Sequence, residues 1–177
     1  MATMEFLADR EIYEQVILRL VPSATRYLWV GTADIKDLHV TVGRRDHMVP
    51  FLKVIADLLE KGVEVRLLHA KEAGPNFRAD FDRYPVLAKS LERMLCPRVH
   101  FKCVIADGVR AYMGSANLTG AGMGAKSPLR RNFENGVLTD DPALLTPLSA
   151  QFDAVWRGEF CSRCGRRAFC ADCPLTD

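Results

Sequence analysis

Residues 99–120 read VHFKCVIADGVRAYMGSANLTG and form the most informative part of the sequence. Two runs rich in β-branched and aromatic residues, 98–106 and 109–114, flank the pair Asp107-Gly108. Such runs favour strands, and an Asp-Gly pair between them is typical of a two-residue hairpin turn. The stretch therefore predicts a β-hairpin.

One face of the first hairpin strand carries polar side chains. Because side chains alternate along a strand, His100 and Lys102 project together, about 7 Å apart for two residues of rise, while their apolar neighbours point into the opposite layer. An imidazole and an ammonium at that separation can bracket one phosphoryl group. The hairpin then ends in Gly114-Ser115-Ala116-Asn117, whose hydroxyl and amide are neutral donors suited to phosphate oxygens.

Working outward from the hairpin, apolar periodicity places helices and strands in alternation. Helical spacing favours residues 11–21, 49–61, 86–95 and 142–156 as helices, and β-rich runs favour 26–32, 63–69 and 133–139 as strands. Residues 71–85 and the glycine-rich residues 120–131 are predicted to be loops. This alternation indicates an α/β fold with a mixed sheet.

The combined pattern resembles the phospholipase D superfamily, whose motif is H-x-K-x4-D followed by G-S-x-N. The resemblance covers about residues 5–157 and implies a mixed β-sheet flanked by helices. It rests on His100, Lys102, Asp107, Gly114, Ser115, Asn117 and, further along, Glu134.

In that family a histidine attacks phosphorus to give a phosphohistidine, which water then releases. Carried over, the resemblance makes His100 the nucleophile and Glu134 the residue that orients its ring. Lys102 and Asn117, with Ser115 nearby, would bind the phosphoryl oxygens. Asp107 is either a site residue or only a turn-former. The scheme requires no catalytic metal.

The family uses two such motifs in one catalytic centre, whereas this chain holds only one complete motif. His69-Ala70-Lys71 repeats the bare H-x-K spacing, but it lacks the Asp and the G-S-x-N. His69, His39 and His47 are therefore expected to be structural or exposed. One imidazole cannot easily act on both sides of phosphorus, so we expect a homodimer that brings His100 of each copy into one active site.

A small segment rich in Arg, Cys and Gly follows Trp156, so the chain divides into a catalytic domain, 1–157, and an appendage, 158–177. The spacing C-x2-C-x5-C-x2-C favours a structural zinc site, with an iron–sulfur centre and metal-free thiols or disulfides as alternatives. Disulfides are disfavoured in a cytosolic chain. The cysteines of this knuckle are Cys161, Cys164, Cys170 and Cys173.

Composition and length limit the classes of protein to which the chain can belong. The chain has 177 residues, of which 49% are hydrophobic and 26% charged, so collagen-like and disordered classes are excluded. No run approaches the roughly 18 apolar residues of a membrane span, and acidic residues precede any long apolar run at the N-terminus. We therefore expect a cytoplasmic protein with no membrane partner.

The substrate is inferred from where the charge lies. Net charge is only +2, but six of the seven charged residues between 98 and 131 are basic. Lys126, Arg130 and Arg131 are candidate contacts to a phosphate backbone, so nucleic acid is the favoured substrate. A phospholipase or phosphatidyl transferase and a non-catalytic nucleic-acid-binding module are the alternatives. The aromatic fraction of 8% indicates no clear base-stacking platform.

Overall fold

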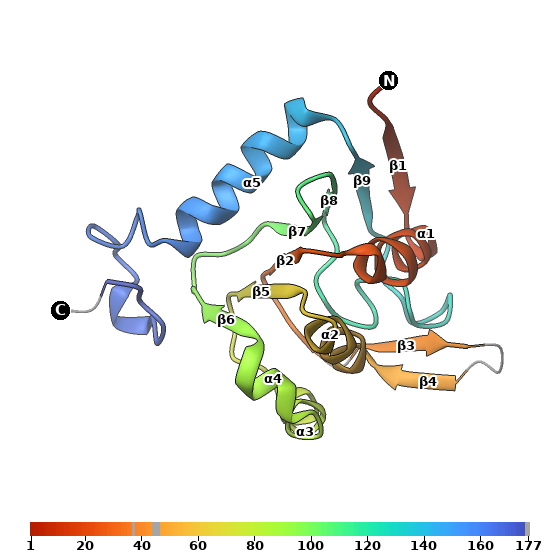
Figure 1. Ribbon diagram of the computed structural model, residues 1–177, viewed down its shortest axis with the longest axis horizontal. Coiled ribbons are helices and arrows are strands. Elements are labelled where there is room, and N and C mark those ends of the chain that lie inside the picture. The colour runs from red at the N-terminus through yellow and green to blue at the C-terminus, as the bar shows by residue number, and fades with distance from the viewer. Residues whose placement is uncertain (37, 44–46, 176–177) are drawn as a thin grey trace.

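A seven-stranded mixed sheet lies at the centre of the molecule (Figure 1). The computed structural model describes residues 1–36, 38–43 and 47–175. The strands are ordered β1-β9-β8-β7-β2-β5-β6, and β2 pairs parallel with β5 but antiparallel with β7. Their bounds are β1 Met4–Ala8, β2 Tyr27–Thr32, β5 Glu64–His69, β6 Glu92–Leu95, β7 Lys102–Ala106, β8 Arg110–Gly114 and β9 Asn135–Thr139. The predicted α/β fold with a mixed sheet is confirmed.

Helices cover both faces of this sheet. On one face lie α1 (Arg10–Ile12), its continuation as the π-helix η1 (Tyr13–Leu20) and the short η2 (Val21–Ser23), together with α2 (Phe51–Glu60). On the other face lies α5 (Pro142–Trp156), whose buried Phe152 stacks on Trp29 of β2 with ring centroids 5.1 Å apart. The two separate apolar layers explain why strands β2 and β7 are apolar on both sides.

The β7–β8 hairpin forms as its sequence predicts. Asp107 and Gly108 at the turn have φ of 55° and 68°, a conformation that an Asp-Gly pair favours, and the Val109 N–H donates to the Ala106 carbonyl at 3.1 Å. Because Ala106 pairs with Arg110, three residues rather than the expected two connect the strands. Val104 of β7 packs into the layer of η1 and α2, whereas Cys103 packs into the layer of α5. The alternation expected along this strand is therefore confirmed.

Two predictions between β5 and β7 are wrong. Residues 71–85 do not form a loop throughout, because α3 (Pro75–Asp82) occupies most of them, with Pro75 in its first turn and the Phe77 and Phe81 rings 6.2 Å apart. The expected helix 86–95 is divided into α4 (Pro85–Ser90) and the strand β6. At β6 the helical spacing does not determine the structure, because pairing with β5 satisfies the backbone N–H and C=O groups of residues 92–95.

Besides β6, three strands were not predicted from the sequence. The edge strand β1 pairs antiparallel with β9, and β3 (His39–Val42) pairs with β4 (His47–Pro50) in a separate two-stranded sheet. The helix expected from residue 49 forms as α2, but it begins at Phe51 because residues 49 and 50 belong to β4. In β1 only Leu7 is buried, so its pattern carries little strand signal.

The cysteine-containing segment after α5 covers the other edge of the sheet, and it includes one short turn of 3-10 helix, η3 (Arg167–Phe169). Asp172 accepts a hydrogen bond from the backbone N–H of Leu95 at 2.8 Å, and the Cys170 thiol donates to the Leu95 carbonyl at 3.6 Å. These contacts satisfy polar groups at the exposed edge of β6. Among the described residues, no helix has both the length and the apolar character needed to cross a membrane.

Candidate active site

The motif residues other than Asp107 gather at one end of the sheet, where β2, β5 and β8 end and β7 and β9 begin. Lys102, the first residue of β7, pairs with Gly114, the last residue of β8. On the other side of β7, Gly31 pairs with Cys103, so the next residue of β2, Thr32, lies beside Lys102. Strand register alone therefore brings the start of the hairpin, its end and the end of β2 together.

His100 and Lys102 form a close pair on one face, as the alternation predicts. The imidazole is exposed, whereas Lys102 is only 9% exposed. The Lys102 ammonium donates to the His100 carbonyl oxygen at 2.7 Å, and its Nζ lies 3.4 Å from His100 Nδ1. The lysine side chain folds back, which brings the ammonium and the imidazole closer than the strand rise alone suggested. A positive charge thus lies directly beside a solvent-accessible ring nitrogen.

Ser115 and Glu134 meet across the ends of β8 and β9. The Ser115 hydroxyl donates to one Glu134 carboxylate oxygen, and the Asn132 amide donates to the other at 3.0 Å. The Glu134 backbone N–H is in turn held by the Asp9 carboxylate at 2.9 Å. The carboxylate is thus engaged by Ser115 and Asn132, and the orienting of His100 by Glu134 stays a prediction.

Gly114 leaves room for the Tyr112 hydroxyl and the Asn135 backbone at the ends of β8 and β9. A Cβ at residue 114 would lie 2.3 Å from the Tyr112 hydroxyl oxygen and 2.4 Å from the Asn135 carbonyl oxygen, distances that no side chain tolerates. Tyr112 is completely buried beneath the site, and this burial raises the pKa of its hydroxyl. The glycine of the motif is therefore required by packing rather than by chemistry.

Asn117 is fixed by a network that includes a residue the sequence did not reveal. Its carbonyl oxygen accepts a hydrogen bond from the backbone N–H of Asp34 at 3.1 Å. Thr32, which is 1% exposed, donates to the Asp34 carbonyl at 2.7 Å and accepts from the Leu118 N–H at 2.9 Å. With its oxygen engaged, Asn117 has its amide N–H donors left to offer to a substrate. The sequence signal for Thr32 was weak: it is a hydroxyl residue at the end of β2, a strand of mostly apolar residues.

Asp107 lies at the opposite end of β7, roughly 20 Å from His100 by the strand rise. Its carboxylate accepts backbone N–H bonds from Thr25, Arg26 and Tyr27 at 2.7–2.9 Å, and a hydroxyl bond from Thr25. Burial alone would raise the pKa of Asp107, but these bonds outweigh it and hold the pKa at about 2. The structure therefore places Asp107 in a bonded turn that joins the hairpin to β2, away from the other motif residues.

The loop between Asn117 and Glu134 carries the predicted basic contacts. Lys126 and Arg130 are exposed and Arg131 is half-buried. The start of the loop is anchored by Arg10, which donates to the carbonyl oxygens of Gly124 and Ala125 at 3.3 and 3.4 Å. Three cations are thus presented on an anchored loop that begins and ends at the site.

The other histidines lie apart from this arrangement. His69 is 1% exposed at the end of β5, with its Nδ1 2.7 Å from the Lys71 carbonyl oxygen. Its burial lowers its pKa and favours the neutral ring. His39 and His47 are exposed on the separate β3–β4 sheet. Structural or exposed positions were expected for all three.

The four cysteines of the appendage do not have the arrangement of a metal centre. Burial and the neighbouring thiol of Cys173 raise the pKa of Cys161 to about 11, whereas Cys164 accepts a hydrogen bond from Arg98 at 3.8 Å. In the described part of the chain, no three His, Cys, Asp or Glu side chains form a group able to hold a metal ion. The zinc predicted at Cys161, Cys164, Cys170 and Cys173 is therefore not supported by their arrangement.

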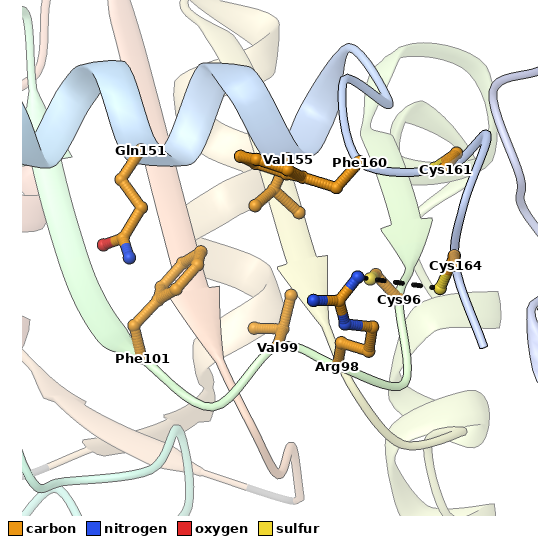
Figure 2. Close-up of a pocket in the computed structure, with 9 residues that line it drawn as sticks. All are labelled: Cys96, Arg98, Val99, Phe101, Gln151, Val155, Phe160, Cys161 and Cys164. Carbon is orange, nitrogen blue, oxygen red and sulfur yellow. Dashed lines mark hydrogen bonds between the residues drawn. The ribbon is translucent and has the colours of Figure 1, made fainter. Parts of the chain in front are cut away.

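A cavity of about 250 Å³ lies between α5, the segment before β7 and the appendage (Figure 2). Val99 and Phe101 line it together with Val155 of α5, and Arg98 extends toward Cys164. Because His100 alternates with Val99 and Phe101, the imidazole faces the other side of this segment. The cavity is thus separate from the His100–Lys102 pair.

The sequence of residues 17–156 matches a family model described as "Cardiolipin synthase, PLD-like domain". No curated protein matches the chain closely enough to count as a relative. The family match covers the sheet from β2 onward and the helices on both of its faces.

Solved structures share this fold at low sequence identity. Nuc from Salmonella typhimurium, a phospholipase D family member, aligns with a TM-score of 0.64 and 19% identity over 89% of this chain and 95% of that one. NucT from Helicobacter pylori aligns with a TM-score of 0.59 and 16% identity over 86% and 94%. Phosphatidylserine synthase from Haemophilus influenzae Rd KW20 aligns with a TM-score of 0.57 and 17% identity over 89% of this chain but 39% of that one. At these identities the likeness concerns the fold alone.

Proposed function

This chain belongs to the phospholipase D-like family, a family of phosphodiesterases, and we propose that it is an endonuclease that cleaves nucleic acid through a phosphohistidine at His100. One observation carries the proposal. An exposed imidazole lies 3.4 Å from a buried ammonium, at the end of the sheet that also holds Ser115 and Asn117. This arrangement combines a nucleophile with donors for phosphoryl oxygens.

The chemistry proceeds in two displacements at phosphorus. A ring nitrogen of His100 attacks, which forms an N–P bond and breaks the P–O bond to the leaving strand. The leaving oxygen takes a proton from a second imidazole on the opposite side. That imidazole then removes a proton from water, and the hydroxide breaks the N–P bond and leaves a phosphate monoester. Lys102 and the Asn117 amide stabilise the charge on the phosphoryl oxygens in both steps, while the Ser115 hydroxyl beside them holds the Glu134 carboxylate.

The second imidazole is supplied by a second copy of the chain. His69 is buried, and His39 and His47 lie on the separate two-stranded sheet, so none of them offers an acid at the His100 site. A twofold axis beside His100 brings the same residue of both copies to one phosphate. We therefore propose a homodimer with one shared active site.

Nucleic acid is the proposed substrate because of the loop from 120 to 134. Lys126, Arg130 and Arg131 lie on it without an acidic residue between 120 and 131, which suits contact to a phosphate backbone. The names of two structural neighbours, Nuc and NucT, are consistent with this choice.

Phosphatidyl transfer on lipids is the second candidate. It is favoured by the description of the matching family model and by the Haemophilus phosphatidylserine synthase among the structural neighbours. The cytoplasmic location stays a prediction from the sequence.

The proposal is tested by assaying His100→Ala on single- and double-stranded DNA, RNA and phosphatidylcholine. Nucleic-acid cleavage should fall by about 10³-fold or more, as expected when a nucleophile is removed. His39→Ala is the matched control, because His39 is exposed but lies on the separate sheet, and it should retain full activity. Unchanged cleavage by His100→Ala would eliminate the mechanism, turnover of the lipid alone would favour the second candidate, and binding without cleavage would indicate a non-catalytic module.

A further inference from the structure

Phe133 is the most exposed aromatic side chain of the described residues. Its exposed fraction is 96%, whereas Phe77 and Phe152 are buried in the two cores. It directly precedes Glu134, the carboxylate that is bonded to Ser115. A ring that is this exposed has no packing role, and beside a candidate active site it is available to a ligand.

The backbone that carries this ring is held on both sides. The Asn132 N–H donates to the Ala121 carbonyl at 3.1 Å, and the Glu134 N–H donates to the Asp9 carboxylate at 2.9 Å. The Asn132 side chain also bonds to the Glu134 carboxylate at 3.0 Å. Phe133 is thus presented from a fixed position, which reduces the entropy lost when its ring contacts a ligand.

Three cations, Lys126, Arg130 and Arg131, precede the ring on the loop, whereas the Glu134 carboxylate that follows it is bonded to Ser115 and Asn132. In the described part of the chain, none of the ion pairs involves Lys126, Arg130 or Arg131. Lys126 and Arg130 are exposed and Arg131 is half-buried. Cations on the same loop as an exposed aromatic ring are a combination by which proteins bind single-stranded nucleic acid, with phosphates on the cations and bases on the ring. The charge complementarity identifies a polyanion that also has flat apolar faces.

We propose that Phe133 stacks on an unpaired base next to the scissile phosphate and so gives the enzyme a preference for single strands. The inference rests on the nuclease activity proposed above and specifies its substrate. In a duplex both faces of each base are already stacked on neighbouring bases, so the ring finds no free face. A single strand offers one at every nucleotide.

The position of Phe133 distinguishes a base from a lipid surface. Side chains that enter a membrane lie at the tip of a loop, and the candidate for such a contact is Leu129, which is 98% exposed and follows Ser127 in a turn in the middle of the loop. Phe133 instead lies at the base of the loop, two residues before β9 begins at Asn135. There it is next to the chemistry, as a base attached to the reacting phosphate must be.

The test compares Phe133→Ala, Phe133→Trp and Leu129→Ala with the unaltered protein. Affinity for a fluorescent single-stranded oligonucleotide is measured by anisotropy, and cleavage is measured on that oligonucleotide, on its duplex and on methyl p-nitrophenyl phosphate, which has no base. Phe133→Ala should lower single-strand affinity and kcat/KM by about 5- to 150-fold, the range for one lost base stack. Duplex and base-free cleavage should change less than about twofold. Phe133→Trp should restore binding, and Leu129→Ala should have little effect.

Several results would overturn the proposal. They are equal losses on single strand and duplex, an unchanged single-strand affinity in Phe133→Ala, or conversion of that variant to a monomer in sedimentation, which would make the ring a contact between copies. Loss of binding to anionic phosphatidylglycerol vesicles in Phe133→Ala would likewise identify a lipid contact. The anisotropy comparison stands even if no substrate is cleaved, so failure of the nuclease assignment is distinguishable from failure of the stacking proposal.

Discussion

Polar side chains lie at both ends of the β7–β8 hairpin, but they are hydrogen-bonded within the chain at one end and available to a ligand at the other. At the turn, the Asp107 carboxylate accepts four hydrogen bonds from residues 25–27, and its pKa falls to about 2. At the open end, the His100 ring is exposed beside the Lys102 ammonium, and the Asn117 amide has its donors left for a ligand. Polar groups satisfied within the chain stabilise the fold, whereas groups left available can act on a substrate.

The largest difference is expected at the open end. Replacing His100 by Ala should abolish catalysis, as described above, but leave the melting temperature within about 2 °C of the unaltered protein, since an exposed side chain contributes little to stability. Differential scanning calorimetry on the variant used in the cleavage assay checks this. A large fall in melting temperature would mean that His100 also belongs to the structural part of the motif.

The reverse pattern is expected at the turn. Asp107→Asn should lower the free energy of unfolding by about 2 kcal/mol at pH 7, from the pKa difference between 3.8 and about 2, while cleavage by the folded protein is retained. Asp82→Asn is the control, because Asp82 is an exposed carboxylate on α3. Urea unfolding at fixed temperature provides the measurement.

The same variant carries a pH signature. The folded pKa of Asp107 lies below its unfolded value, so the stabilisation is complete above about pH 5 and is lost as pH falls toward 2. The difference in unfolding free energy between the unaltered protein and Asp107→Asn should therefore shrink between pH 6 and pH 2. A constant difference over that range would show that the carboxylate charge is not what stabilises the turn.

A smaller effect on kcat is expected at Thr32, which lies at the open end but acts through Asn117. Thr32→Val removes the hydroxyl that fixes Asp34 and Leu118 around Asn117, and we expect kcat to fall about tenfold with KM nearly unchanged. Thr32→Ser keeps the hydroxyl and should restore kcat to within about threefold. Equal loss in both variants would point to packing of the methyl group rather than to positioning of Asn117.

Sequence reasoning worked where a local rule determines the structure. Alternation placed His100 and Lys102 on one face, and the Asp-Gly pair identified the turn. It failed at residues 92–95, because strand formation there depends on pairing with β5, far away in the sequence. A helical spacing over ten residues carries no information about that partner.

The same limit applies within the site. The order of the strands puts Thr32 beside Lys102, and only the fold reveals the position of a threonine that has no motif of its own. Likewise, an aromatic fraction of 8% did not indicate that one phenylalanine, Phe133, is exposed to solvent beside the candidate active site. For Asp107 both a turn role and a site role were open, and its four bonds to residues 25–27 favour the turn.

The most direct test of the shared active site is the activity of a heterodimer with one unaltered chain and one His100→Ala chain, purified through two different affinity tags. If each phosphate requires an imidazole from both copies, this heterodimer should be as inactive as the His100→Ala homodimer, about 10³-fold below the unaltered dimer. Retention of about half the activity would show that each chain holds a complete site by itself and would contradict the account.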